Sequence, residues 1–340
     1  MKNFEWTQPE TVTDAVTALA HPGAMVLAGG VDLLDRLKEN VTAPSRLVSI
    51  RKVAGLGDLT VDKSGTKIGA NITLARLAAD AGFRAAHPIV ADAAGHAATP
   101  QLREMATIGG NLAQRPRCWY FRSEAFHCRK KGGTTCFAHD GDNQMHAIFA
   151  NKTCAATHPS TVVTALIALG AKVGIAGKVA REVELVNFFA TPEIDLSREI
   201  LLEPGELITH ISLPPAPANL RTAYTKQVAK QSFDWPLVDV AVALTMDGKT
   251  CRAATIVLGA VAPTPMRATA AEQVLVGSTV DVLAAGKAAR AAIANATPLS
   301  GNDHKVVILQ VVIARTILAA LAPRTSPTVA STPSSMGGTQ

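Results

Sequence analysis

Aromatic residues make up only 4% of this 340-residue chain, and charged residues only 18%. So few aromatic side chains argue against a protein that stacks nucleic-acid bases along its length. Cysteine is rare too, and five residues are too few for a disulfide-stabilised secreted scaffold. No stretch reaches the roughly 18 uninterrupted apolar residues that a membrane span needs. Apolar residues nevertheless account for 48%, which excludes a chain that is disordered throughout.

The sequence also lacks the common catalytic signatures. It contains no metalloprotease HExxH, no P-loop and no hydrolase GxSxG motif, and no paired-carboxylate or nucleophile–base arrangement stands out. We therefore expect its chemistry to come from bound cofactors. The N-terminal residues show neither a signal peptide nor a twin-Arg signal. We expect cytoplasmic residence, or export together with a partner that carries a signal.

The length suggests two or three domains, and the apolar pattern predicts strands mixed with helices. Pro214–Pro217 is a candidate domain linker, and the Ser/Thr/Pro-rich tail from Pro323 is predicted to be disordered. The best-defined elements are strands at 24–28, 46–50, 238–246 and 253–261, and helices at 32–39, 162–170, 280–294 and 305–321.

Two Gly-Gly pairs lie where the backbone can approach a ligand closely. Gly29–Gly30 separates the first predicted strand from a helix, and Gly109–Gly110 lies in a long irregular region with Asn111 beside it. Free N–H groups at a helix start attract an anion such as a pyrophosphate. Together the two loops favour a site for a long diphosphate ligand. A plain strand-to-helix turn and an asparagine-stabilised turn are the alternatives.

Four of the five cysteines fall within 37 positions, with the spacing C-x9-C-x7-C-x17-C. Four thiolates suit either a tetrahedral zinc ion or an iron–sulfur cluster, and this spacing does not distinguish the two. Unliganded thiols are a third interpretation. Trp119-Tyr120-Phe121 follows the first cysteine and is expected to shield a cofactor from water. Cys251 lies in a predicted strand and is expected to be a small core residue.

Much of the positive charge is local as well. The stretch from Arg103 to Lys131 carries a net charge of +5 of the chain's +6. It overlaps the second glycine pair and the first two clustered cysteines. Compensation of an anionic cofactor, a nucleic-acid patch and a solvated loop are the three interpretations.

In combination, the segments 27–34 (LAGGVDLL) and 107–111 (TIGGN) resemble the FAD-binding subunit of molybdopterin dehydrogenases, the xanthine dehydrogenase family. The resemblance extends from Met1 to Leu321. The cysteine segment resembles the extra loop that binds a [4Fe-4S] cluster in the flavin subunit of periplasmic aldehyde oxidoreductases. Further family-like stretches follow in the family's order at 158–160, 205–208, 224–226 and 259–263. The cluster ligands that this resemblance implies are Cys118, Cys128, Cys136 and Cys154.

The resemblance implies an α+β fold. A two-subdomain FAD-binding domain of the vanillyl-alcohol oxidase type would be followed by a small α+β C-terminal domain. The implied boundaries are 1–55 for the first FAD-binding subdomain, 56–213 for the second with a Cys-rich iron–sulfur insertion at about 113–157, 218–322 for the C-terminal domain and 323–340 for the tail.

The resemblance also implies a set of FAD contacts, with the two glycine loops near the diphosphate and ribityl group. Ile208 would pack near the isoalloxazine, and Lys226 would lie near the cofactor. The family usually has Asp at the position of Thr161. The threonine hydroxyl can replace one hydrogen bond of that aspartate but not its negative charge. The implied contact residues are Leu27, Ala28, Gly29, Gly30, Val31, Asp32, Leu33, Leu34, Ala97, Thr107, Ile108, Gly109, Gly110, Asn111, Thr161, Ile208 and Lys226.

The function that the resemblance implies is electron transfer, with no catalytic residue on this chain. A large molybdopterin-binding subunit would oxidise the substrate, an aldehyde by resemblance, and a small [2Fe-2S] subunit would pass electrons to FAD and on to an external acceptor. A stand-alone FAD oxidase and a zinc-stapled basic binding module are the alternatives.

Overall fold

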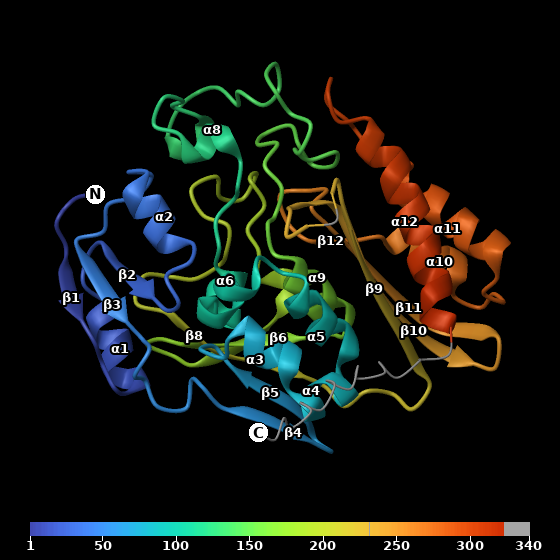
Figure 1. Ribbon diagram of the computed structural model, residues 1–340, viewed down its shortest axis with the longest axis horizontal. Coiled ribbons are helices and arrows are strands. Elements are labelled where there is room, and N and C mark those ends of the chain that lie inside the picture. Colours follow the sequence, from blue (N-terminus) through green and yellow to red (C-terminus); the bar gives the residue numbers. More distant parts are fainter. Residues whose placement is uncertain (231, 323–340) are drawn as a thin grey trace, which may run out of the picture.

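Three separate β-sheets follow one another along the sequence, with helices packed around them (Figure 1). The structure is a computed structural model and describes residues 1–230 and 232–322. The tail 323–340, predicted to be disordered, lies outside the described residues. Sheets and segregated helices of this kind make the fold α+β, as expected.

The first sheet is parallel and has the order β1-β3-β2. Parallel neighbours need a crossover connection, and the helix between β2 and β3 provides it. This confirms the strand–helix–strand unit that the apolar pattern predicted. Thr11 caps the first helix by accepting from Asp14 N. The elements are β1 (Glu5–Thr7), α1 (Val12–Leu19), β2 (Ala24–Leu27), α2 (Leu33–Lys38) and β3 (Arg46–Ser49).

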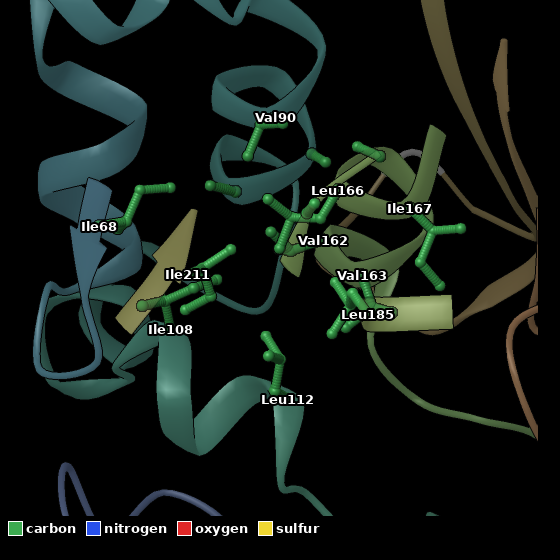
Figure 2. Packing of buried hydrophobic residues seen from close by; sticks show 14 of the residues in the cluster. Ile68, Val90, Ile108, Leu112, Val162, Val163, Leu166, Ile167, Leu185 and Ile211 are labelled. Carbon is green, nitrogen blue, oxygen red and sulfur yellow. The ribbon is translucent and has the colours of Figure 1, made fainter. Parts of the chain in front are cut away.

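The second sheet is antiparallel, with the order β4-β5-β8-β6-β7. Helix α9 is buried along its whole length and packs beside this sheet with α5, as Figure 2 shows for Val162, Leu166 and Val90. The strands are β4 (Leu59–Asp62), β5 (Gly65–Gly69), β6 (Lys172–Ala176), β7 (Arg181–Glu184) and β8 (Leu207–Leu213). The helices are α3 (Leu74–Ala79), α4 (Ala81–Ala86), α5 (Pro88–Gly95), α6 (Pro100–Met105), α7 (Ile108–Leu112), α9 (Thr161–Ala168) and the short η2 (Leu185–Asn187).

The third sheet is antiparallel, with the order β12-β11-β10-β9. Helix α9 packs on β10 and β11, whereas α10 and α12 also pack on this sheet and α11 packs on both of those helices. Helix α9 therefore lies between the second and third sheets. The elements are β9 (Leu220–Val228), β10 (Pro236–Asp247), β11 (Thr250–Gly259), β12 (Met266–Arg267), α10 (Thr269–Leu275), α11 (Val282–Ile293) and α12 (His304–Leu321).

Helix α12 is, by length and composition alone, long and apolar enough to cross a membrane, with a mean hydropathy of 1.7. Its apolar face is occupied in the fold, because α12 packs on β9 and β10 and buries Leu309, Ile313 and Ile317. We read it as a core helix of the third sheet.

The cysteine segment has little regular structure. Between α7 and α9 it contains only α8 (Trp119–Arg122) and the single turn η1 (Arg129–Lys131). Its second half is nevertheless fixed to the turn that follows β11 of the third sheet. Ile148 N and Phe149 N both donate to Val261 O, and His158 N donates to Ala262 O. Figure 1 shows the segment at the top of the molecule, above the layer that contains α6 and α9.

Candidate functional site

A cavity of about 690 Å³ opens where the three sheets approach one another. Val26 of β2, Ile208 of β8 and Lys226 of β9 all line it. The wall is mostly apolar, with polar groups gathered at the two glycine loops and at Lys226. Such a cavity is large enough for a cofactor and is the kind of site in which one binds.

The first glycine loop connects β2 to α2 and presses against the end of α6. A Cβ on Gly29 would lie 1.7 Å from Met105 O, so any side chain there would collide with backbone. Gly30 has a φ of 78°, which glycine adopts without strain. The two glycines are therefore required by close approach and by conformation.

The second glycine loop differs from expectation, since the region around Gly109 is helical rather than irregular. Thr107 starts α7 by accepting a hydrogen bond from Gly110 N at 3.2 Å. A Cβ on Gly109 would lie 2.9 Å from Ala70 Cβ, so this glycine allows α7 to pack closely against residues after β5. Asn111 is held by Ser160, whose hydroxyl donates to Asn111 Oδ1.

The structure brings together nearly all of the residues implied to contact FAD. Only Leu27 and Ile108 lie outside the cavity wall; both side chains are buried in the apolar cores, and neither residue is a cavity contact. The residues of that set that do line the cavity are Ala28, Gly29, Gly30, Val31, Asp32, Leu33, Leu34, Ala97, Thr107, Gly109, Gly110, Asn111, Thr161, Ile208 and Lys226.

Sequence reasoning missed two parts of the wall. One is the end of α5 and α6, including Thr99 and Met105, and the other is the segment before β10. That segment carries two exposed aromatic side chains, Phe233 and Trp235, and each faces a guanidinium: Arg103 lies 5.8 Å from the Phe233 ring centroid. The signal available in the sequence was two aromatic residues within three positions of so aromatic-poor a chain.

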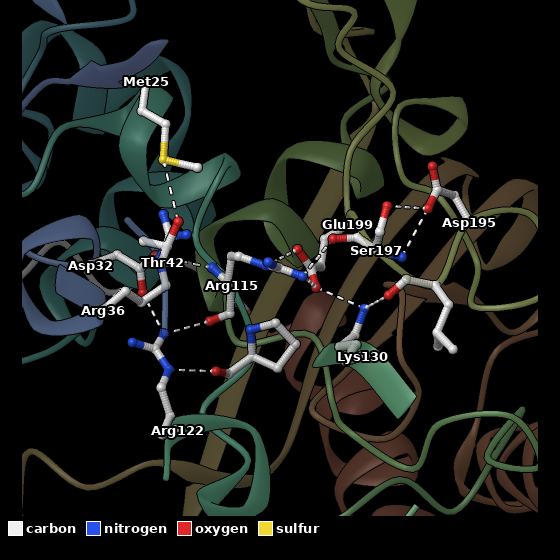
Figure 3. Close-up of polar contacts among 12 residues, drawn as sticks. Met25, Asp32, Arg36, Thr42, Arg115, Arg122, Lys130, Asp195, Ser197 and Glu199 are labelled. Carbon is white, nitrogen blue, oxygen red and sulfur yellow. Dashed lines mark hydrogen bonds and ion pairs between the residues drawn. The ribbon is translucent and has the colours of Figure 1, made fainter. Parts of the chain in front are cut away.

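Asp32 connects the first glycine loop to the cysteine segment (Figure 3). Its carboxylate accepts from Arg36 Nε at 3.0 Å and from Arg122 Nη2 at 2.6 Å. Arg117 Nη2 lies 3.1 Å away, and the backbone N–H of Arg115 donates at 3.2 Å. Burial alone would raise the pKa of Asp32, but the guanidinium groups outweigh burial and hold this pKa below its ordinary value.

A second buried carboxylate, Glu199, pairs with the same basic stretch. Arg115 Nε and Lys130 Nζ each lie 2.7 Å from its oxygens. Figure 3 shows Arg115 between the two carboxylates. The described cations at 115, 117, 122 and 130 are thus engaged in internal ion pairs. This argues against both the nucleic-acid patch and the solvated loop.

The four clustered cysteines influence one another. Burial, and to a smaller extent the neighbouring Cys128 and Cys136, raises the pKa of the Cys118 thiol to about 11. The hydrogen bond with Cys154 lowers the pKa of Cys136 to about 5 and raises that of Cys154. All five cysteines are free thiols, and Cys251 is fully buried in the core of the third sheet, as expected.

His146 reaches into the same group of thiols. Its Nε2 lies 3.2 Å from Cys118 Sγ. The Trp119 ring packs edge-on against the imidazole, with 4.8 Å between the two ring centroids. Burial lowers the pKa of His146 to about 4, so the imidazole is neutral and can donate its N–H to sulfur. Trp119 thus covers His146, and the shielding of a cofactor by the Trp-Tyr-Phe run stays a prediction.

Within residues 1–230 and 232–322, no group of three or more His, Cys, Asp or Glu side chains is arranged to hold a single metal ion. A tetrahedral zinc site is therefore not preformed there. The thiolates of a cubane cluster each bind a different iron and lie farther apart than the ligands of one ion. The four clustered cysteines are free thiols, and Lys130 lies beside Cys154.

Comparison with known proteins identifies the family. Residues 2–216 match the FAD binding domain in molybdopterin dehydrogenase, and residues 223–307 match the CO dehydrogenase flavoprotein C-terminal domain. The chain belongs to this family of FAD-binding subunits. The aldehyde oxidoreductase FAD-binding subunit PaoB of Escherichia coli is 35% identical over 80% of this chain and 86% of its own. The carbon monoxide dehydrogenase medium chain of Afipia carboxidovorans is 30% identical over 88% of both chains.

Solved structures agree with this assignment. Quinoline 2-oxidoreductase from Pseudomonas putida 86 matches with a TM-score of 0.73 at 26% identity, over 94% of this chain and 98% of that one. Carbon monoxide dehydrogenase from Hydrogenophaga pseudoflava matches with a TM-score of 0.74 at 27% identity, over the same shares. The FAD-binding subunits of molybdopterin dehydrogenases therefore share both the sequence pattern and the three-sheet arrangement found here.

The residues of the cavity fit the FAD of this family. Gly29 and Gly109 both line the cavity, and the lack of a side chain lets their loops pack closely on Met105 and Ala70. FAD is long, with an anionic diphosphate between two ring systems, and the cavity has apolar walls with the first glycine loop and the start of α2 between them. The N–H groups of Gly109, Gly110 and Asn111 are already bonded to Ala70 and Thr107, so the second loop contributes shape.

Proposed function

We propose that this chain is the flavin subunit of a molybdenum-dependent aldehyde oxidoreductase and transfers electrons from a partner's [2Fe-2S] centres to an external acceptor. The observation that carries the proposal is the single cavity onto which both glycine loops converge. The aldehyde as substrate class is supported by the 35% identity to the aldehyde oxidoreductase subunit. Selection of the substrate belongs to the partner chain.

In this proposal the chain contributes binding and orientation. The first glycine loop and the start of α2 hold the FAD diphosphate through their backbone N–H groups, and the second glycine loop forms the opposite part of the wall. Ile208 packs on the isoalloxazine, and the Lys226 side chain lies at the same wall. FAD, when bound, supplies the ability to exchange one or two electrons. The apolar wall limits access of water to it, which fixes the potential at which electrons are exchanged.

The cysteine segment adds a [4Fe-4S] cluster to the proposal, held by Cys118, Cys128, Cys136 and Cys154. The proximity of these cysteines to one another and the buried Lys130 beside Cys154 support it, since a thiolate-ligated cluster is anionic. Asp32 connects this segment with the first glycine loop, which gives the cluster a fixed position relative to the cavity. The cluster is then either a relay to the flavin or a structural support of the segment.

The test is cofactor analysis of the full chain purified anaerobically. We expect one FAD and about four iron and four acid-labile sulfide per chain. FAD without iron would overturn the cluster and leave the flavin subunit standing. Zinc without iron, together with salt-sensitive DNA binding, would favour the zinc-stapled module instead. Absence of FAD would overturn the main proposal.

The partner assignment has its own test. Co-expression with candidate large and small subunits should yield a complex in which aldehyde reduces the flavin of this chain. The isolated chain should not turn over aldehydes, and turnover without partners would revive the stand-alone oxidase.

A further inference from the structure

A buried carboxyl group lies directly behind the cavity wall. Asp239 is on β10, and only 1% of its surface is exposed. In the sheet it is flanked by Lys226 of β9 on one side and by Gly259 of β11 on the other. No element of the proposed electron-transfer function uses this acid.

The carboxyl group occupies space that a missing side chain leaves open. A Cβ on Gly259 would lie 2.3 and 2.5 Å from the two carboxylate oxygens of Asp239 and 2.5 Å from Thr164 Oγ1. The carboxyl and the threonine hydroxyl therefore share the pocket above this glycine. A carboxylate that stays charged in a protein interior normally collects several hydrogen-bond donors.

Such donors are incomplete here. Asp239 Oδ1, Thr164 Oγ1 and the Tyr224 hydroxyl are all buried and lack a hydrogen bond of ordinary geometry. The Thr164 hydroxyl lies beside the Asp239 carboxyl and the Thr161 hydroxyl lies beside Tyr224, but neither contact is well aligned. Poorly satisfied buried polar atoms are uncommon, and three of them in one place require a functional or structural reason. A group whose protonation changes during the working cycle is such a reason, because no fixed set of donors suits both of its forms.

The cluster is connected to the cavity through two residues. Burial and the nearby Asp239 carboxyl raise the pKa of the Tyr224 hydroxyl, whereas the Thr161 hydroxyl lowers it. Thr161 lines the cavity. Lys226, the strand neighbour of Asp239, lines it too.

The charged and titratable groups that face Asp239 come from two elements: Lys226 and Tyr224 from β9, and Lys305 from α12. Helix α9 contributes only the hydroxyl of Thr164, and the facing position of β11 is a glycine. Burial outweighs the two ammonium groups and raises the pKa of Asp239 to about 7. The charge of this acid is therefore easily changed near neutral pH.

We propose that Asp239 takes up a proton when electrons enter the flavin and releases it when they leave. The proposal rests on FAD binding in the cavity. Two electrons come from the partner's iron–sulfur centres, and one proton comes from solvent. The new bond is the O–H of the Asp239 carboxyl, and no other bond of this residue changes. Because negative charge arriving in a low-dielectric cavity attracts a proton, the uptake offsets part of that charge. On transfer of the electrons to the acceptor, the proton returns to solvent.

The consequence is an added pH dependence of the flavin potential. Above about pH 7, Asp239 is a carboxylate in the oxidised protein and gains a proton on reduction. The potential then falls more steeply with rising pH than proton uptake by the flavin alone would cause. Below that pH Asp239 is already protonated and the extra dependence vanishes.

The test compares the wild-type chain, loaded with FAD, with Asp239→Asn, Asp239→Glu and the control Asp92→Asn, which changes a carboxylate of α5 paired with Arg84. Flavin potentials are measured by spectroelectrochemistry across the pH range around neutrality. Asp239→Asn should lose the steeper segment, whereas Asp239→Glu and Asp92→Asn should keep it. The reduced-minus-oxidised infrared spectrum of the wild type should contain the C=O band of a protonated carboxyl that Asp239→Asn lacks and Asp239→Glu shifts.

Identical potential curves in the wild type and Asp239→Asn, or a carboxyl band that persists in Asp239→Asn, would overturn the proposal while leaving FAD binding intact. If Asp239→Asn fails to fold, the pair of wild type and Asp239→Glu decides, because an unshifted band cannot come from residue 239. A wild-type chain without FAD would instead overturn the proposed function, so the two failures are distinguishable.

Discussion

At the scale of single residues, Asp32 connects more parts of the protein than its place in a glycine loop suggested. It was implied as a cofactor contact, and it does line the cavity, but most of its contacts are with cations of the cysteine segment. Only 11% of its side chain is exposed. One carboxylate therefore fixes two functional regions relative to each other, and the guanidinium groups around it would repel one another without it.

Replacement of Asp32 by Asn should accordingly be costly. The buried guanidinium groups of Arg36 and Arg122 would lose their shared anion, and breaking a buried pair in this way lowers the free energy of unfolding by about 3–5 kcal/mol. Urea denaturation measures this value. The control is Asp35→Asn, because that carboxylate is 55% exposed and its pair with Arg117 spans 3.8 Å. The control should lose less than about 1 kcal/mol of unfolding free energy. Equal losses in the two variants would show that Asp32 does not hold the surrounding guanidinium groups together.

His158 gives a pH-dependent prediction at the same scale. Burial lowers its pKa to about 3, whereas in the unfolded chain a histidine titrates near about 6.5. Between these values the unfolded chain binds a proton that the folded chain does not. Stability is therefore complete above about pH 6.5 and falls on acidification by up to about 1.4 kcal/mol per pH unit from this residue.

The variant His158→Asn keeps an acceptor for Ser160 N, which donates to Nδ1 in the wild type. Its free energy of unfolding should fall less steeply than the wild-type value between neutral and mildly acidic pH, although its value at neutral pH is lower. The exposed His21→Asn should keep the wild-type slope. Parallel slopes for all three proteins in urea titrations would contradict the assignment.

At the scale of elements, the first glycine loop is defined by its contact with the end of α6. Gly29→Ala places a methyl group 1.7 Å from Met105 O, so the loop or α6 must move. We expect a loss of about 1–3 kcal/mol in stability and at least about tenfold weaker FAD binding, which corresponds to about 1.4 kcal/mol. Flavin fluorescence quenching measures the affinity.

Gly57→Ala is the matched control for that change. No atom lies within 4 Å of a Cβ at this position, and its φ is not positive. Replacing a glycine without strain leaves stability unchanged or raises it by about 0.4–1 kcal/mol. Should Gly29→Ala bind FAD as tightly as Gly57→Ala, the close approach of the loop would not be needed for the cofactor.

The elements that the sequence predicted well are those with one apolar face and clear ends. The strands around Asp247–Gly248 and the closing helices α11 and α12 are confirmed within a few residues. The region of α7 was expected to be irregular because Gly109 and Gly110 disfavour a helix, yet the cap by Thr107 and packing on Ala70 form one turn. Strand β9 could not be identified, since nearly all of its residues are half-buried and no alternation appears.

At the scale of the whole molecule, the site arises from contacts between distant parts of the chain. The glycine loops could be found because glycine pairs are visible as local motifs. The partners of the basic stretch could not, because Glu199 lies 84 positions from Arg115 and has no motif around it. For the same reason the buried Asp239 had no local signal: its environment is assembled from β9, β11, α9 and α12.

The cysteine segment shows the same principle, because the third sheet's domain holds it in place. Asn302, just before α12, is fully buried, and its side chain donates to the carbonyls of Asn143, His146 and Ala147 at 3.1 to 3.3 Å. The neighbouring Lys305 donates to His146 O at 2.9 Å. His146 in turn contacts Cys118, so the loop before α12 determines where a proposed cluster ligand lies.

Asn302→Ala should therefore lower the content of one cofactor, the iron–sulfur cluster, and leave the content of the other, FAD, unchanged. The substitution removes three hydrogen bonds to the segment and the acceptor of Leu299 N. We expect the free energy of unfolding to fall by about 1–3 kcal/mol. Iron and sulfide per chain should fall, while FAD content stays at the wild-type value because Asn302 does not line the cavity. The exposed neighbour His304→Ala should retain both cofactors. Parallel loss of FAD and iron in Asn302→Ala would mean that the variant unfolds as a whole, and unchanged iron would show that the segment does not depend on this domain for its position.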